Sequence, residues 1–71
     1  MFTYKVSFFD CGLQFVKSGQ YLPFETFQTS DYKNARKNCL EFTTDDENCS
    51  AVLVNQETGN RIYFQAGQEK A

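Results

Sequence analysis

The chain has 71 residues, 41% of them hydrophobic and 23% charged, and its 7 basic and 9 acidic side chains leave a net charge of −2. These figures describe one small globular domain and exclude general electrostatic attraction to nucleic acid or to an anionic membrane. Eight phenylalanines and four tyrosines make up 17% of the chain. A core of this size contributes a net ~3–5 kcal/mol, so aromatic side chains that lie outside it need an explanation.

Residues 2–9, "FTYKVSFF", alternate apolar and polar side chains and predict a β-strand. Its apolar face carries Phe2, Tyr4, Val6 and Phe8, and its other face carries Lys5 and ends in Phe9. The following "DCG" predicts a two-residue turn at Cys11-Gly12, which would set Phe8 against Phe15.

Residues 13–28 fit either one long return strand with a bulge at Ser18-Gly19 or two short strands joined there. Pro23 cannot donate to a sheet ladder, so this segment belongs at an edge. We expect an interrupted edge strand.

Residues 29–44 predict a helix, with Ser30 as its N-cap and Asp31 in its first turn. The apolar stripe follows helical spacing and comprises Tyr32, Ala35, Cys39 and Phe42, with Leu40 at its border. The acidic run Asp45-Asp46-Glu47 opposes the helix dipole, so the helix should end just before it.

Residues 50–65 predict a β-hairpin with a three-residue loop, Glu57-Thr58-Gly59, closed by Gln56 and Asn60. That register puts Val52, Val54, Ile62 and Phe64 on one face, and Leu53 and Tyr63 on the other. Residues 66–71 should form a frayed tail.

The predicted fold is a single α+β domain over residues 1–71, with the order ββαββ and one helix on one face of an antiparallel sheet. The helix should cover the face formed by Phe2, Tyr4, Val6, Phe8, Phe15, Val52, Val54, Ile62 and Phe64. The opposite face should stay open and carries Lys5, Phe9, Val16, Leu53, Arg61 and Tyr63.

Residue types that carry common enzyme chemistry are sparse, and we expect no enzyme and no cofactor. The chain has no histidine, which removes Cys–His and Ser–His catalysis, and it has no glycine-rich phosphate loop. Cys11, Cys39 and Cys49 have no paired spacing, so we expect reduced, structural thiols and no metal site. The acidic run lacks the alternating ligands of a calcium loop.

The start of the chain, "MFTYKVSFFDCG", alternates in polarity and does not predict a signal peptide. The sequence contains no apolar run of membrane-spanning length. We therefore expect a cytoplasmic protein with no membrane partner.

The open sheet face makes a protein interface the leading functional hypothesis, because aromatic and arginine side chains dominate such interfaces. Its candidate partner-binding residues are Phe9, Leu53, Arg61 and Tyr63. The ββαββ layout of this small, histidine-free, aromatic-rich chain is similar to that of several small phage and mobile-element proteins. That resemblance rests on layout alone and implies an accessory or inhibitory protein that occludes a surface of one host protein.

Two alternatives remain open. A nucleic-acid-binding module would use the basic helix face, Lys33, Arg36 and Lys37, or Lys5 together with Tyr63. A structural protein would use the open face to close a homodimer. No small-molecule substrate is expected in any of these cases.

Overall fold

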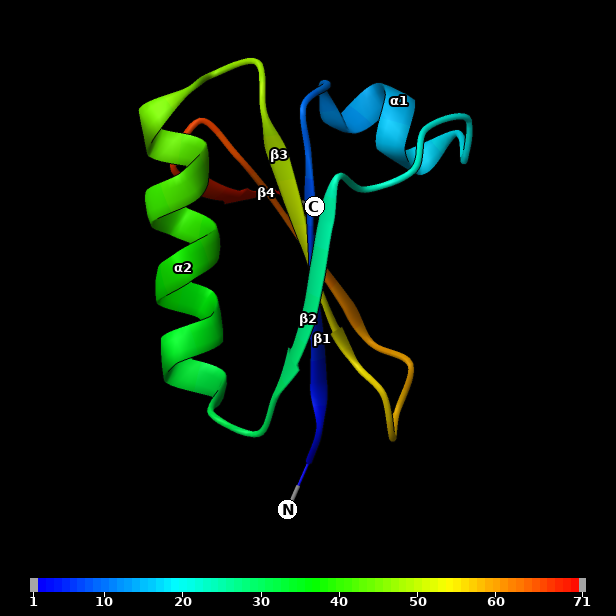
Figure 1. Ribbon diagram of the computed structural model, residues 1–71, viewed down its shortest axis with the longest axis vertical. Helices are drawn as coiled ribbons and strands as arrows, with labels where there is room; N and C mark the ends of the chain where they lie inside the picture. Colours follow the sequence, from blue (N-terminus) through cyan, green and yellow to red (C-terminus); the bar gives the residue numbers. More distant parts are fainter. Residues whose placement is uncertain (1, 71) are drawn as a thin grey trace.

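The computed structural model describes residues 2–70 and places one sheet between a long and a short helix (Figure 1). The elements are β1 (Tyr4–Phe9), α1 (Leu13–Lys17), β2 (Glu25–Thr29), α2 (Tyr32–Asp45), β3 (Ser50–Asn55), β4 (Arg61–Gln65) and β5 (Gln68–Lys70). The five strands are antiparallel and lie in the order β2-β1-β3-β4-β5. The predicted α+β class, with its main helix packed on one face of an antiparallel sheet, is confirmed; α1 and β5 are additions to the predicted order.

The N-cap of α2 is Asp31, one residue after the predicted N-cap Ser30, so the helix begins at Tyr32. The Asp31 side chain accepts a hydrogen bond from the backbone N–H of Asn34 at 3.1 Å, which satisfies one of the donors that a helix start leaves unpaired. The helix ends at Asp45, the first residue of the acidic run, close to the predicted end.

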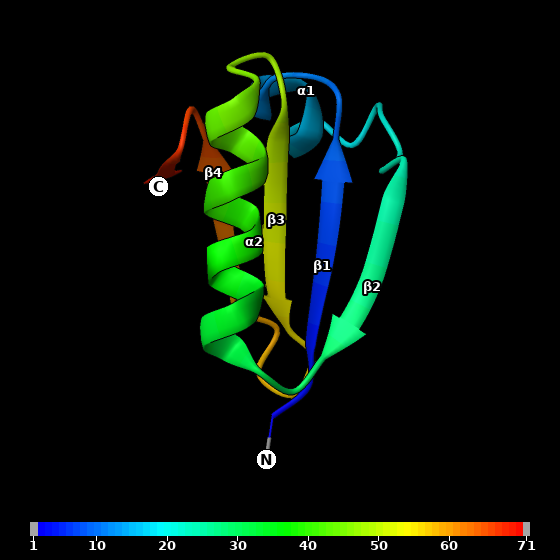
Figure 2. The same cartoon turned by 60° about the vertical axis from the view of Figure 1, so that its left-hand side comes forward.

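The core lies between α2 and the sheet (Figure 2). Its buried members are Val6, Phe8, Ala35, Cys39, Ala51, Leu53 and Phe64, with Tyr4, Phe27, Leu40, Phe42 and Ile62 packed around them. Phe8 stacks on Phe42 with ring centroids 4.4 Å apart, so β1 and α2 meet through aromatic rings. Thr43 is also fully buried, and its hydroxyl donates to the Cys39 carbonyl at 2.9 Å. The predicted stripe of α2 therefore faces the sheet.

The turn between β3 and β4 differs from the predicted one by a single residue. It is closed by Asn55 and Asn60, not by Gln56 and Asn60, because the backbone N–H of Asn55 donates to the carbonyl of Asn60 at 2.9 Å. The loop is therefore 56–59, one residue longer than predicted. Gly59 has the left-handed φ of 80° that the sequence predicted for it.

This one-residue difference inverts the faces of β3, because side chains alternate along a strand. Leu53 lies opposite Ile62 and Val54 opposite Arg61. Leu53 consequently packs under α2, where only 1% of it is exposed, and Val52 and Val54 lie on the opposite face. The predicted faces of β3 were wrong, whereas those of β4 were right.

The segment after β1 is not the predicted return strand. Residues 13–17 form α1, and the backbone N–H groups of Phe15 and Val16 both donate hydrogen bonds to the Gly12 carbonyl. Phe15 lies on this helix and contacts the Tyr21 ring at 5.4 Å between centroids, so the predicted pairing with Phe8 is wrong. Within the segment 13–28, the predicted edge position is correct only for residues 25–28, which belong to β2 at the edge of the sheet beside β1.

Both ends of the described chain also depart from expectation. Phe2 is 50% exposed and does not join the core face. In place of a frayed tail, β5 pairs with β4, and the Gly67 N–H donates to the Thr43 hydroxyl at 3.1 Å. Residue 71, the last of the predicted tail, lies outside the described residues.

Candidate functional site

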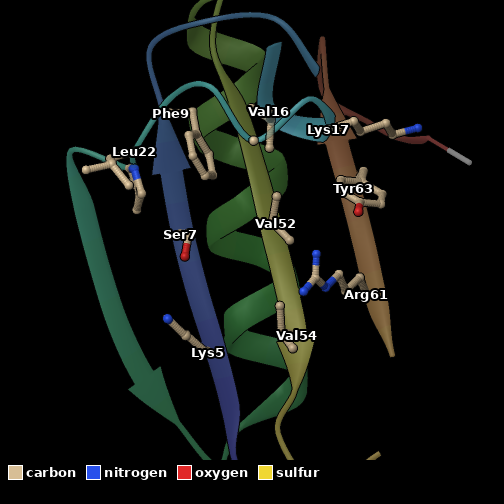
Figure 3. A pocket seen from close by; sticks show the side chains of 12 residues that line it. Lys5, Ser7, Phe9, Val16, Lys17, Leu22, Val52, Val54, Arg61 and Tyr63 are labelled. Carbon is tan, nitrogen blue, oxygen red and sulfur yellow. The ribbon is translucent and has the colours of Figure 1, made fainter. Parts of the chain in front are cut away.

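The face of the sheet opposite α2 forms the floor of a groove (Figure 3). Strand pairing arranges this floor in two rows that cross β1, β3 and β4. The first row is Lys5, Val54 and Arg61, and the second is Ser7, Val52 and Tyr63. Phe9 follows Ser7 on the same side of β1 and ends the floor beneath α1.

Helix α1 and the loop after it form the wall of this groove. Val16, Lys17, Gly19, Leu22 and Pro23 line it, and the cavity volume is about 450 Å³. The side-chain amide oxygen of Gln65 accepts from the Leu13 N–H at 3.5 Å, which joins the start of α1 to β4. The second face of the sheet is therefore covered at one end by the chain itself, which leaves Phe9 and Val52 only 8% and 7% exposed.

The lining of the groove carries three cationic side chains, Lys5, Lys17 and Arg61, and no carboxylate. The Lys17 ammonium lies 4.7 Å from the centroid of the Tyr63 ring, a cation–π distance. The chain as a whole is acidic, with a net charge of −2, so this grouping of positive charge is local to the groove. The site is therefore apolar under α1, with Lys17 on the wall and Lys5 and Arg61 at its open end.

Three of the four predicted partner-binding residues, Phe9, Arg61 and Tyr63, meet in this groove. Leu53 does not, because the register of the hairpin places it in the core beneath α2. Lys5, which belonged to the alternative nucleic-acid set, lines the same groove.

The other alternative residues, Lys33, Arg36 and Lys37, lie on α2, which covers the opposite face of the sheet. Lys37 is paired there with Glu41 at 3.9 Å, and both side chains are largely exposed. The basic helix face and the groove are thus two separate surfaces.

Sequence reasoning missed the residues of the groove wall, Lys17 and Leu22 among them. Leu13 and Val16 have the i, i+3 spacing of one helix face, but one such pair in so short a segment does not separate a helix from a strand. Val16 was placed on the correct face of the sheet but as part of a strand.

An apolar rim adjoins the wall on the side of β2. Leu22, which lines the groove, is 89% exposed. Phe24 is 57% exposed, but its ring lies 5.7 Å from that of Phe42 on α2 and so belongs to the other side of the sheet. Phe15 of α1 and Tyr21 of the following loop are also exposed and contact each other edge to face. An apolar group of this kind beside a groove is typical of an interaction surface.

The three cysteines are free thiols. Burial raises the pKa of the Cys39 thiol to about 12. Burial, together with the Asp46 carboxylate, raises the pKa of Cys49, and burial with Asp10 raises that of Cys11. Because the thiolate is the nucleophile and the metal ligand, these environments disfavour both roles. Within residues 2–70 no three His, Cys, Asp or Glu side chains are grouped to hold a metal.

Comparisons with known proteins leave the groove as the principal functional evidence. No family model, curated protein or solved structure matches the chain. The helices of the described region are too short or too polar to cross a membrane.

Proposed function

We propose that this protein is a non-enzymatic protein-binding module that takes part of a partner into the groove between α1 and the sheet. The observation that carries the proposal is the composition of the groove: two aromatic side chains, Phe9 and Tyr63, beside Arg61 and two lysines, without a carboxylate. Aromatic and arginine side chains are the anchors of protein interfaces. By covering the surface it binds, a small domain of this kind acts as an accessory or inhibitory protein.

The apolar rim favours a protein partner over nucleic acid. Leu22, which lines the groove and is 89% exposed, extends it with apolar surface, whereas nucleic-acid interfaces are rich in positive charge. A nucleic acid would also benefit from the basic face of α2, but the sheet separates that face from the groove. One strand therefore cannot follow both surfaces as a continuous basic track.

The experiment is affinity capture with the immobilised protein, followed by titration of the captured partner against two matched variants. Tyr63→Ala removes an aromatic anchor and should weaken binding by about 1–3 kcal/mol. The control, Lys33→Gln with Arg36→Gln and Lys37→Gln, changes three charges on α2 and should leave binding unchanged. A protein partner lost only in the α2 variant would contradict the proposal.

The nucleic-acid alternative rests on one observation, the Tyr63 ring beside Lys17 in a cationic groove. Single-stranded bases stack on such rings, and their binding weakens steeply with salt. A mobility shift with a thymidine oligonucleotide, abolished by Tyr63→Ala and by salt, would favour this function. A native mass of two chains with no other partner would favour the homodimer.

A further inference from the structure

We infer that the occupant of the groove is an extended acidic segment of the partner, with an apolar side chain against the edge of α1 and a carboxylate between Lys5 and Arg61. This inference rests on the proposed function and specifies the chemistry of the partner. It follows from the polarity of the two ends of the groove, their charges and the spacing of the two floor rows.

The end of the groove at the edge of α1 is suited to an apolar side chain. Phe9, Val16 and Val52 converge there, with the Tyr63 ring at the side (Figure 3). Phe9 and Val52 are already buried by α1, so a side chain of the partner would rest against the edge of this apolar cluster and not beneath the helix. A polar group of the partner placed there would lose its hydration without a matching donor or acceptor, which disfavours it.

The open end is suited to a carboxylate. Lys5 and Arg61 lie in one row and flank Val54, two strand spacings apart, which is about 9–10 Å between their backbones. Both side chains are long enough to converge on an anion above Val54. The guanidinium of Arg61 can hold a carboxylate with two parallel hydrogen bonds, and Lys5 adds a point charge.

The charge of the lining separates acidic occupants from others. Lys5 and Arg61 both carry positive charge, and no lining residue supplies a negative one. A basic segment would therefore meet like charge at each of these positions, whereas an acidic segment meets complementary charge. The charge of the lining therefore favours an acidic occupant over a basic one.

The spacing of the floor rows fits a segment in extended conformation. Val52 and Val54 are two positions apart on β3, which corresponds to about 6.6 Å along a strand. Side chains at positions i and i+2 of an extended peptide are separated by the same distance and point to the same side. The expected pattern in the partner is therefore an apolar residue and an aspartate or glutamate two positions away.

A random library of displayed linear peptides tests this directly. Peptides selected on the native protein should be enriched in aspartate and glutamate, with an apolar residue two positions from the acid. The double variant Lys5→Glu with Arg61→Glu should lose that enrichment. The matched control, Lys33→Glu with Arg36→Glu, carries the same charge change on α2 and should keep it.

A selected peptide is then titrated by fluorescence anisotropy. Lys5→Gln with Arg61→Gln should weaken its binding about tenfold or more, as should replacing its acid by the amide. Circular dichroism shows whether the charge-reversal variant is folded. If it is unfolded, the neutral variant Lys5→Gln with Arg61→Gln tests the same two side chains.

The inference is overturned if no peptide is enriched, if the enriched peptides lack acids, or if the neutral variants bind them equally well. Its failure is distinct from failure of the proposed function. A captured protein lost in Tyr63→Ala but retained in Lys5→Gln with Arg61→Gln would leave the binding module standing with a different occupant. Binding of a thymidine oligonucleotide through Tyr63, with no protein captured, would overturn both.

Discussion

Asn55 closes the β3–β4 turn with Asn60 and also holds the loop inside it. Its side-chain oxygen accepts hydrogen bonds from the N–H groups of Glu57 and Thr58 at 3.0 and 3.3 Å. The turn thus selects the register that sends Val52 and Val54 to the groove.

Replacing Asn55 by alanine should destabilise the fold by about 1 kcal/mol, because two loop N–H groups lose their acceptor. Chemical denaturation measures this cost. Gln56→Ala, at an exposed position of the same turn, is the control and should change the unfolding free energy by less than about 0.5 kcal/mol. Equal effects of the two substitutions would show that the Asn55 side chain does not organise the loop.

The faces of β3 can be tested with neighbouring residues. Leu53→Ala should cost about 2–5 kcal/mol, because it opens a cavity beneath α2. Val54→Ala, on the groove floor, should cost about 1 kcal/mol or less, since that side chain is only partly buried. Thermal and denaturant unfolding of both variants gives the comparison. A larger loss of stability in Val54→Ala than in Leu53→Ala would support the predicted register with the three-residue loop instead.

The Cys39 thiol should make the fold sensitive to alkali. Burial raises its pKa from 9.0 to about 12, so the unfolded chain loses this proton at a lower pH than the folded protein. The contribution to stability is therefore fully present below pH 9.0 and is lost as the pH rises toward 12. The slope for one thiol approaches about 1.4 kcal/mol per pH unit.

Denaturation of the wild type and Cys39→Ala across this pH range isolates that slope from other titrating groups. The variant should be less stable at neutral pH and show a shallower alkaline loss. Parallel curves for the two proteins would mean that the thiol does not carry the effect.

Two glycines with left-handed backbone should respond differently to alanine. Gly67 has a φ of 70°, and an added Cβ would collide with the Thr44 hydroxyl. Gly19 has a φ of 77° but open space around it. Both substitutions should cost about 1 kcal/mol of backbone strain, and Gly67→Ala should cost more because Thr44 must move. Unfolding free energies measure the difference, and equal losses would show that Thr44 yields freely.

The elements predicted from the sequence were those with strong local patterns. Alternation identified β1, and the repeat of Ala35 and Cys39 at helical spacing identified α2 and its buried face. Helix α1 was missed because five residues span little more than one turn, which is too short for periodicity to separate a helix from a strand. Strand β5 was missed because its three exposed residues carry no apolar pattern.

The groove was predicted in part for the same reason. Phe9 and Tyr63 lie on strands whose faces were inferred correctly, so both reach the outer side. Leu53 was misplaced because the glycine that ends the loop fits both a three-residue and a four-residue turn, and the hydrogen bond between Asn55 and Asn60 decides between them. The wall depended on α1, so Lys17 and Leu22 could not be inferred.

The position of β1 between β2 and β3 has a consequence for the order of folding events. The Ser50 hydroxyl bonds the Cys11 carbonyl at 2.7 Å and thereby joins residues 39 positions apart. Helix α2 can form locally within about a microsecond, yet its buried stripe has no complete sheet to pack on until β3 has crossed this distance to reach β1. Closing that long loop should limit the refolding rate, so substitutions that weaken the β1–β3 ladder should slow folding more than they speed unfolding.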